Sequence, residues 1–307
     1  MEIKYNKKRD DITFCTMLFK MPDQKNLSAI KRRDRKFEDF YLKSLEKLIN
    51  TFERVALWCD KETAIFLKSK GLDKKIIMRV MNFSQLPIYK KREVNLGLLE
   101  GMKNNVGFLL RHKKPNEWLD YLSIILSKPE IIRWAAENNK FKSNYFMWID
   151  AGSFNPNFAR CWKKWPGYIS ARPKRCRFCI APTLGKSPPH FIPRFVYNIY
   201  KKISKPIKPA TSKTLSKQSM VDIAMINADY DVPGGSFMIP KKWVETFYEY
   251  FNSMIIIMQK HGLVSVEQAV FQMMFKFDYR NMFEFSYINE YVELYTSIAK
   301  SKADYYL

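Results

Sequence analysis

Short apolar runs alternate with amphipathic stretches along the first half of the chain. Residues 12–19 are dominated by β-branched and apolar side chains, which is typical of a buried strand. Apolar residues recur at helical spacing over residues 37–52 and predict an amphipathic helix. Further apolar runs at residues 55–58 and 75–80 predict two more strands. Strands that alternate with helices in this way favour a parallel sheet with right-handed crossovers.

The most informative run covers residues 145–149 and ends at Asp150. Five apolar or aromatic residues in a row suit a strand that is buried on both faces. Ser127 with Glu130 three residues later forms a capping-box pattern, which predicts a helix before this strand. An acid at the C-terminal end of such a strand lies where open α/β sheets bind ligands. Gly152 would let a ligand approach the backbone closely.

The second half of the chain contains another strand pattern and two more helix patterns. Residues 223–227 predict a short strand, which leads into an acidic and then a glycine-rich turn. Residues 243–258 are aromatic and predict a helix. Ser265 and Glu267 belong to a second capping-box pattern, which places Glu267 in the first turn of a further helix. No glycine-rich phosphate loop is present, which argues against dehydrogenases and P-loop NTPases.

Charge adds a strong preference for polyanionic partners. The chain of 307 residues carries a formal net charge of +23, while 47% hydrophobic residues supply enough material for a large core. Residues 151–221 contain no Asp or Glu and are rich in Lys, Arg, Pro and aromatic residues. Three interpretations of this basic stretch stay open: a solvated loop, a segment that docks on an anionic membrane surface, and a contact for nucleic acid or an acidic acceptor.

The sequence also indicates a compartment. The N-terminus has no apolar signal region, and no apolar run is long enough to span a membrane. Five cysteines in 307 residues form no disulfide framework, in agreement with a reducing environment. We therefore expect a cytoplasmic protein that can associate peripherally with the cytoplasmic face of a membrane.

Four segments carry a resemblance to a known family. They read SIILSKPEIIRWAAENNKFKSNYFMWIDAGS (123–153), ITFCTMLF (12–19), VPGGSFMIPKKWVETF (232–247) and SVEQAVFQMM (265–274). Together they resemble the HtrL/YibB family of GT-A-like glycosyltransferases from bacterial surface-polysaccharide pathways. The first segment is the most specific of the four, and the matches are spread over most of the chain.

The resemblance implies an α/β fold with a GT-A-like (Rossmann-like) mixed sheet flanked by helices. It implies a single domain over residues 1–307, with a nucleotide-sugar-binding half at 1–153 and an acceptor-side half at 219–307. Residues 160–218, which lie within the basic stretch, have no counterpart in the family and are expected to form a Pro- and aromatic-rich insertion. The implied activity is transfer of a sugar from a nucleotide-diphosphate sugar to a surface-glycan or glycolipid acceptor.

Such a reaction commonly uses Mn²⁺ or Mg²⁺, held by carboxylate oxygens, to neutralise the leaving diphosphate. The resemblance places Asp150 where GT-A enzymes carry an Asp-x-Asp element, so Asp150 is the predicted metal and donor ligand. Only Asp-Ala-Gly stands here, and one carboxylate is therefore missing. Asp229 and Asp231 form a literal Asp-x-Asp and are candidates for a second contribution, although turns also favour Asp. A purely structural acid at the strand end is the alternative for Asp150.

The acceptor side is predicted to use Glu267 and two glycines. Glu267 could take the proton from an acceptor hydroxyl, or it could merely complement the helix dipole. Gly234 and Gly235 could expose backbone to the acceptor hydroxyls, or form an ordinary tight turn.

The donor side is predicted to use residues near the ends of the first strands. Asp60 ends the second predicted strand and suits a contact with the base or ribose, and Thr13 and Thr16 could face the nucleotide in the same way. Lys128 and Arg35 could bind phosphate, with the plain surface cation as the alternative for each.

Two rival functions remain at this point. The first is a basic nucleic-acid-binding protein, which the net charge favours but for which acids at strand ends have no use. The second is a catalytically inactive relative that docks on a membrane, which the incomplete Asp-x-Asp favours.

Overall fold

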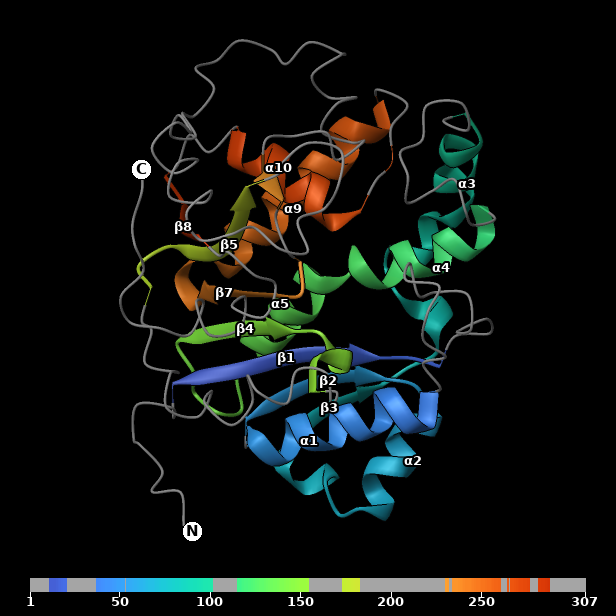
Figure 1. The fold of residues 1–307 in the computed structure, drawn as a ribbon, viewed down its shortest axis with the longest axis vertical. Helices are drawn as coiled ribbons and strands as arrows, with labels where there is room; N and C mark the ends of the chain where they lie inside the picture. Colours follow the sequence, from blue (N-terminus) through green and yellow to red (C-terminus); the bar gives the residue numbers. More distant parts are fainter. Residues whose placement is uncertain are drawn as a thin grey trace.

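A computed structural model of the chain (Figure 1) describes residues 11–20, 37–52, 54–101, 115–154, 173–182, 230–231, 234–260, 264, 266–276 and 281–287. These residues build one mixed β-sheet with helices on both faces (Figure 1). The predicted α/β class, a mixed sheet flanked by helices, is therefore confirmed.

Four parallel strands form one half of the sheet. They are β1 (Ile12–Leu18), β2 (Val55–Cys59), β3 (Ile76–Val80) and β4 (Tyr145–Ile149), in the spatial order β3-β2-β1-β4. All four were predicted from apolar runs. The runs of β1, β2 and β4 are nearly continuous because both faces of a parallel sheet are covered, whereas the outer strand β3 is partly exposed and contains Arg79.

The other half of the sheet is mixed. β7 (Ser236–Pro240) pairs antiparallel with β4, and β5 (Cys176–Pro182) pairs antiparallel with β7. β6 (Tyr230–Asp231) and β8 (Phe283–Tyr287) both pair with β5, giving eight strands in the described part of the chain. Because β7 runs against β4, the start of β7 lies beside the end of β4.

The helical segments follow the strands in chain order. They are η3 (Phe37–Leu42), α1 (Lys43–Thr51), α2 (Lys61–Ser69), η4 (Asp73–Lys75), η5 (Phe83–Gln85), η6 (Tyr89–Lys91), α3 (Arg92–Gly101), α4 (Pro115–Ile125), α5 (Lys128–Asn138), η7 (Ala151–Phe154), η10 (Lys241–Trp243), α9 (Val244–Lys260) and α10 (Glu267–Lys276). Among the described residues, no helix is both long enough and apolar enough to cross a membrane.

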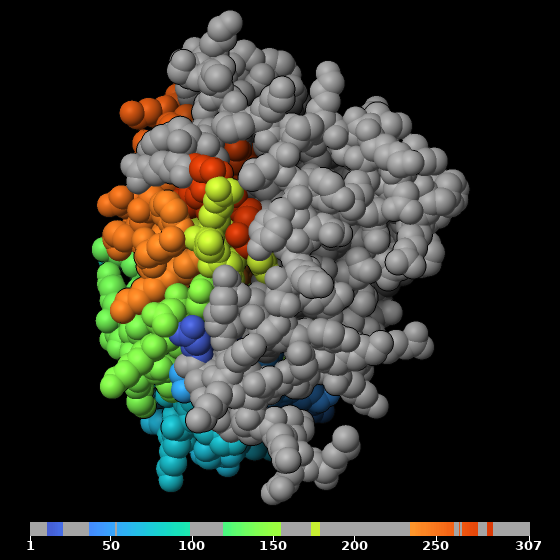
Figure 2. Space-filling view, turned by 90° about the vertical axis from the view of Figure 1, so that its left-hand side faces the viewer, coloured from blue at the N-terminus to red at the C-terminus, as the bar shows by residue number. Residues whose placement is uncertain are grey.

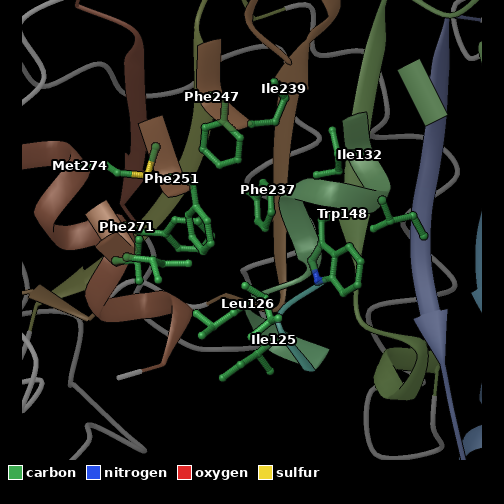
Figure 3. Packing of buried hydrophobic residues seen from close by; sticks show 14 of the residues in the cluster. Ile125, Leu126, Ile132, Trp148, Phe237, Ile239, Phe247, Phe251, Phe271 and Met274 are labelled. Atoms are coloured by element: carbon green, nitrogen blue, oxygen red, sulfur yellow. The ribbon is translucent and has the colours of Figure 1, made fainter. Parts of the chain in front are cut away.

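The two faces of the sheet bury separate apolar clusters. Phe146, Trp148 and Phe237 point to the face covered by α5, α9 and α10, where they pack among aromatic and aliphatic side chains (Figure 3). Phe14 and Met147 point to the opposite face, which α1 covers. Side chains two residues apart on a strand point to the same face. Asp150 therefore lies on the same face of the sheet as Trp148.

Sequence signals placed the helices better than their caps. The helix predicted over residues 37–52 is present and opens with the π-helical turn η3. Helix α5 also lies where expected, but the predicted cap by Ser127 is wrong. Its hydroxyl donates to the carbonyl of Ser123 at 2.6 Å, back into the preceding helix α4, and does not cap α5. Ser265 and residues 223–227 lie outside the described residues.

Part of the stretch expected as an insertion belongs to the central sheet. β5 lies within residues 160–218, and its Arg177 is paired in register with Glu284 of β8. The two side chains form a buried ion pair of 2.7 Å. The rest of the stretch lies outside the described residues, and the division into two halves and an insertion stays a prediction.

Candidate functional site

The candidate site lies at the edge of the sheet where the parallel strands end. Asp150 follows β4, and its backbone N–H donates to the carbonyl of Gly235 at 3.1 Å. This bond joins the end of β4 to the loop that opens β7. The first turns of α5 and α10 meet at the same place, because Lys128 and Glu267 are in contact. Four segments that are far apart in sequence therefore converge here.

Lys128 is the centre of this arrangement. It is the first residue of α5, and its side chain is only 3% exposed. The Nζ atom lies 2.7 Å from Oε1 of Glu267, 2.8 Å from the carbonyl oxygen of Gly234 and 3.2 Å from Oδ1 of Asp150. An ammonium group has three N–H bonds, so these three acceptors use all of them. Lys128 was predicted to bind donor phosphate; its ammonium would first have to release one of these partners.

The burial of Lys128 is tolerated because opposite charges surround it. Burial alone lowers the pKa of its ammonium, but the charges of Asp150 and Glu267 and their hydrogen bonds raise it. The net effect is a raised pKa, so the group is charged at neutral pH. The Trp148 ring adds a cation–π contact, with its centroid 5.2 Å from Nζ.

Asp150 is held by one oxygen and open at the other. Its Oδ1 accepts from Nε1 of Trp148 at 2.7 Å and lies 3.2 Å from Lys128 Nζ. The side chain is 43% exposed, and Oδ2 has no hydrogen bond or ion pair with the described residues. One lysine and two carboxylates sum to a net charge of −1. Because Lys128 and Trp148 hold Oδ1, the remaining negative charge of the cluster is available at Oδ2.

The carboxylate of Glu267 is buried, in contrast to that of Asp150. It is the first residue of α10, as the sequence indicated, but its side chain is only 6% exposed and its Oε1 is bound to Lys128. Gly234 lies against it: a Cβ there would stand 2.1 Å from Oε1 of Glu267. Gly234 is thus required for packing, and its carbonyl accepts a hydrogen bond from Lys128, while a contact of Gly234 or Gly235 with acceptor hydroxyls stays a prediction. The carbonyl of Gly235 is bound to the backbone of Asp150.

Gly152 also has a packing role. It lies in η7, and a Cβ at this position would come within 3.1 Å of Tyr41 and 3.2 Å of Phe40. The ring carbons of η3 thus occupy the space that the missing side chain leaves. Close approach at Gly152 is real, but in this structure the neighbours are two aromatic side chains.

Tyr121 of α4 is a member of the site that sequence reasoning missed. Burial raises the pKa of its phenol, and the charges of Glu267, Asp150 and Tyr41 raise it further, so that it lies well above the usual value. The phenol consequently keeps its proton at any physiological pH. Trp148 was missed as well, because an aromatic residue inside an apolar strand gives no sign that its N–H reaches an acid two residues on.

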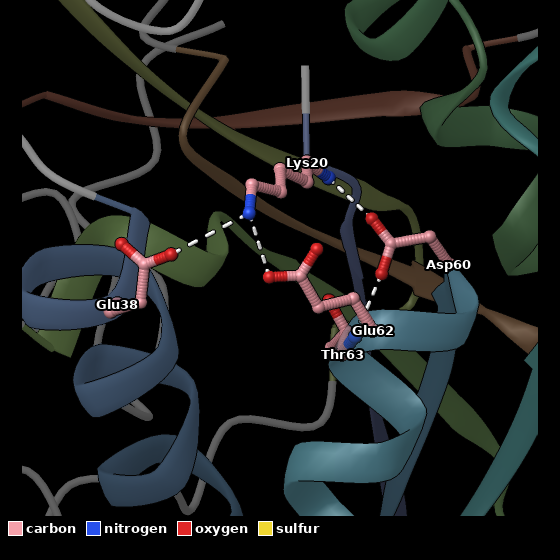
Figure 4. Close-up of polar contacts among 5 residues, drawn as sticks. All are labelled: Lys20, Glu38, Asp60, Glu62 and Thr63. Atoms are coloured by element: carbon pink, nitrogen blue, oxygen red, sulfur yellow. Dashed lines mark hydrogen bonds and ion pairs between the residues drawn. The ribbon is translucent and has the colours of Figure 1, made fainter. Parts of the chain in front are cut away.

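Asp60 caps a helix. It lies at the end of β2, as predicted, and its Oδ1 accepts from the backbone N–H of Thr63 at 2.7 Å, which makes it the N-cap of α2. Its Oδ2 accepts from the backbone N–H of Lys20 (Figure 4). The Lys20 ammonium in turn contacts Glu62 at 2.8 Å and Glu38 at 3.6 Å. Both oxygens of Asp60 thus hold the ends of β1 and β2 in place, and a contact with base or ribose stays a prediction.

The two threonines of β1 lie away from the cluster. Thr13 sits at the opposite end of the strand, where its buried hydroxyl donates to Ser143 at 2.9 Å. Thr16 is fully buried, and by strand alternation it faces α1 and not α5. Its hydroxyl has no hydrogen-bond partner in the part of the chain that the structure describes. Thr13 therefore lies on the same sheet face as Asp150 but at the other end of the strands, as a core residue, whereas Thr16 lies on the opposite face.

The structure describes the remaining predicted residues only in part. Arg35 and Asp229 lie outside the described residues, and Asp231 is described only by its backbone in β6, where it pairs with Ala181. Within the described ranges, no three His, Cys, Asp or Glu side chains are grouped so that they could hold a metal ion.

Comparisons with known proteins give little further information. No family model matches the sequence, and no curated protein matches it. Among solved structures, the chain is similar to the apo form of mouse xyloside xylosyltransferase 1, with a TM-score of 0.35 and 9% sequence identity. The match covers 89% of this chain and 84% of that chain. A likeness of this size supports no conclusion about activity, and the resemblance to the HtrL/YibB family stays a prediction.

Proposed function

We propose that this chain is a GT-A-like glycosyltransferase that moves a sugar from a nucleotide-diphosphate sugar to a glycan or glycolipid acceptor. The observation that carries the proposal is the buried Lys128, which binds Asp150 and Glu267 where the parallel strands end. Ligands of open α/β sheets bind at that edge. The segments that supply Lys128, Asp150 and Glu267 are also those that resemble the HtrL/YibB family.

Sugar transfer breaks the bond between the anomeric carbon and the diphosphate and forms a bond from that carbon to an acceptor oxygen. The acceptor hydroxyl must lose a proton, and the departing diphosphate gains negative charge. An enzyme accelerates this reaction by placing fixed charges where charge develops. In our proposal the accessible Oδ2 of Asp150 faces the donor, while Lys128 and Trp148 hold Oδ1 and prevent rotation of the carboxylate.

A divalent cation fits this site only if it shares its ligands with the donor. Oδ1 of Asp150 already binds an ammonium group, which leaves Oδ2 as the oxygen for a cation. Mg²⁺ is commonly held by one or two carboxylates together with substrate phosphates, and one free oxygen suits that arrangement. A cation bound there would neutralise the leaving diphosphate. The described residues do not offer the carboxylates for a cation held by the protein alone.

Lys128 and Glu267 act in this account as positioning residues. Their pairing keeps both charges buried and holds the first turns of α5 and α10 against the loop before β7. A proton-accepting role of Glu267 toward the acceptor stays a separate prediction. It requires a Glu267→Gln variant that binds donor normally but loses turnover together with the acidic limb of its pH–rate profile.

The direct test is transfer or donor hydrolysis, screened over nucleotide sugars with and without Mn²⁺. We expect activity from the unmodified chain and its loss in Asp150→Asn, which keeps the shape of the side chain. Asp39→Asn is the matched control, because Asp39 is a 64% exposed acid that forms an exposed ion pair with Lys43. The proposal fails if no nucleotide sugar binds and Asp150→Asn leaves every activity unchanged.

A further inference from the structure

The edge of the sheet opposite the candidate site is lined with cations. Parallel strands start at this edge, and the antiparallel β7 ends there. In the spatial order β3-β2-β1-β4-β7-β5, five of the six strand ends carry Lys or Arg in the adjoining loop. We call this set the basic edge; it comprises Lys74 and Lys75 (β3), Arg54 (β2), Lys140 and Lys142 (β4), Lys241 and Lys242 (β7), and Lys174 and Arg175 (β5).

These loops touch one another, so the cations form one row. The backbone N–H of Lys241 donates to the carbonyl of Asn144 at 2.7 Å, and Trp243 Nε1 donates to the carbonyl of Lys174 at 3.0 Å. Arg54 donates through Nη1 to the carbonyl of Phe141 at 3.0 Å. Figure 2 views the molecule from the side on which β4 begins, and the green, orange and yellow segments lie next to one another there. Neighbouring strands are about 4.8 Å apart, so the row from β3 to β5 extends over roughly 24 Å.

The two edges of the sheet differ in charge. All seven lysines of the basic edge are exposed. Asp11 and Asp73 are the acids in the same described loops, and Glu137 and Glu245 nearby share Arg133. At the other edge, Asp60, Glu62, Glu38, Asp150 and Glu267 gather around Lys20 and Lys128. Among the described residues, the strand ends opposite the candidate site therefore carry more lysines than acids, and an anionic surface would attract this side of the sheet.

We propose that the basic edge docks this chain on an anionic phospholipid surface. Lysine ammonium groups are compact point charges that suit phosphate headgroups, and each lysine near such a surface contributes to binding. A single-stranded nucleic acid would need exposed aromatic rings for base stacking. The aromatic residues between or beside these cations, Phe141 and Trp243, are both half-buried, and the N–H of Trp243 is bound to Lys174.

The docking is electrostatic and leaves the candidate site clear of the lipid. The exposed large apolar side chains of the described residues are Ile65, Val80, Val94 and Ile256, none of which belongs to the loops of the basic edge. Asp150 lies at the far end of β4, whose five residues span about 17 Å. This inference does not depend on the proposed function, since it concerns a different edge of the sheet.

The test is co-sedimentation of the full chain with vesicles of phosphatidylcholine alone and of phosphatidylcholine mixed with phosphatidylserine. We expect binding to the anionic vesicles only, weakening steeply as salt is added. A variant with four neutralised lysines from four loops of the row should bind far more weakly, by about fivefold for each lysine removed. That variant is Lys74→Gln, Lys140→Gln, Lys174→Gln and Lys241→Gln.

A matched control removes the same charge from other exposed positions. The control variant is Lys47→Gln, Lys61→Gln, Lys90→Gln and Lys91→Gln. Equal loss of binding in both variants would mean that net charge alone drives association, which overturns the proposal. Equal binding to neutral vesicles would overturn it as well. Displacement of the chain from anionic vesicles by DNA at equal phosphate concentration would assign the basic edge to nucleic acid instead.

Discussion

Replacing Lys128 by methionine removes the ammonium from the site and keeps a long unbranched side chain. Glu267 then remains buried without its counter-charge, and the carbonyl of Gly234 loses its donor. At 2.7 Å and an effective dielectric constant of about 20, the attraction between Lys128 and Glu267 is about 6 kcal/mol before desolvation is subtracted. Breaking a buried pair from one side costs about 3–5 kcal/mol in practice, because an uncompensated charge is left behind. We expect that loss for Lys128→Met in the free energy of unfolding.

The double variant Lys128→Met/Glu267→Gln separates this electrostatic loss from a loss of packing. Both charges are then absent, so its stability should exceed the value that the two single variants predict by about 2 kcal/mol. Urea unfolding with a shared slope measures all four proteins. If the two single losses add to within about 0.5 kcal/mol, the residues do not interact as described, and the account of the buried pair is refuted.

The same double variant distinguishes positioning from folding. Since Oδ1 of Asp150 has lost its ammonium partner, donor turnover should stay low even where stability is largely restored. Turnover that returns in proportion to stability would show that Lys128 contributes to the fold alone.

Two further predictions follow from the packing and the ionisation of the same cluster. Gly234→Ala should destabilise the chain by about 1–3 kcal/mol in urea unfolding, since its methyl group would overlap the carboxylate of Glu267. The control is Gly97→Ala in α3, where the added methyl group meets nothing within 4 Å and should be neutral or stabilising. Equal effects of the two substitutions would contradict the geometry. The raised pKa values of Lys128 and Tyr121 mean that both hold their protons more tightly in the folded state than in the unfolded state. The stabilisation from each group is therefore complete below its unfolded pKa, which is 10.5 for Lys128 and 10.0 for Tyr121, and it is lost as the pH rises through the folded pKa. Urea midpoints should thus fall above about pH 10 and fall less in Tyr121→Phe, and a midpoint that rises with pH in this range would contradict the assignment.

The strands were predictable because their signal is local. β1, β2 and β4 are buried on both faces and appear in the sequence as runs of apolar and β-branched residues, whereas the run of the outer strand β3 is interrupted by the exposed Arg79. The position of Asp150 followed from its run in the same way, since an acid directly after a buried strand must lie at the sheet edge. The cap of α5 was not predictable, because Ser127 could bond forward or back and the preceding helix offered a closer carbonyl.

The contacts that assemble the site were not predictable, because they join residues that are far apart in the sequence. Lys128 meets Gly234 and Glu267 at separations of 106 and 139 residues. From the sequence alone, a lysine at the start of a helix is expected to be a surface cation. In the structure, the loop before β7 and the first turn of α10 bury it. Gly234 likewise read as an exposed turn, and only the position of the Glu267 side chain explains why no Cβ is tolerated.

The central claim is that Asp150, oriented by Lys128 and Trp148, faces the diphosphate of a nucleotide sugar. A crystal of the full chain soaked with a nucleoside diphosphate and Mn²⁺ tests it most directly. The account predicts an anomalous manganese peak at about 2.1 Å from Oδ2 of Asp150, shared with the phosphates, while Lys128 stays bound to Oδ1 and Glu267. A diphosphate bound away from Asp150, or a Lys128 that leaves Glu267 to bind the phosphate, would contradict it.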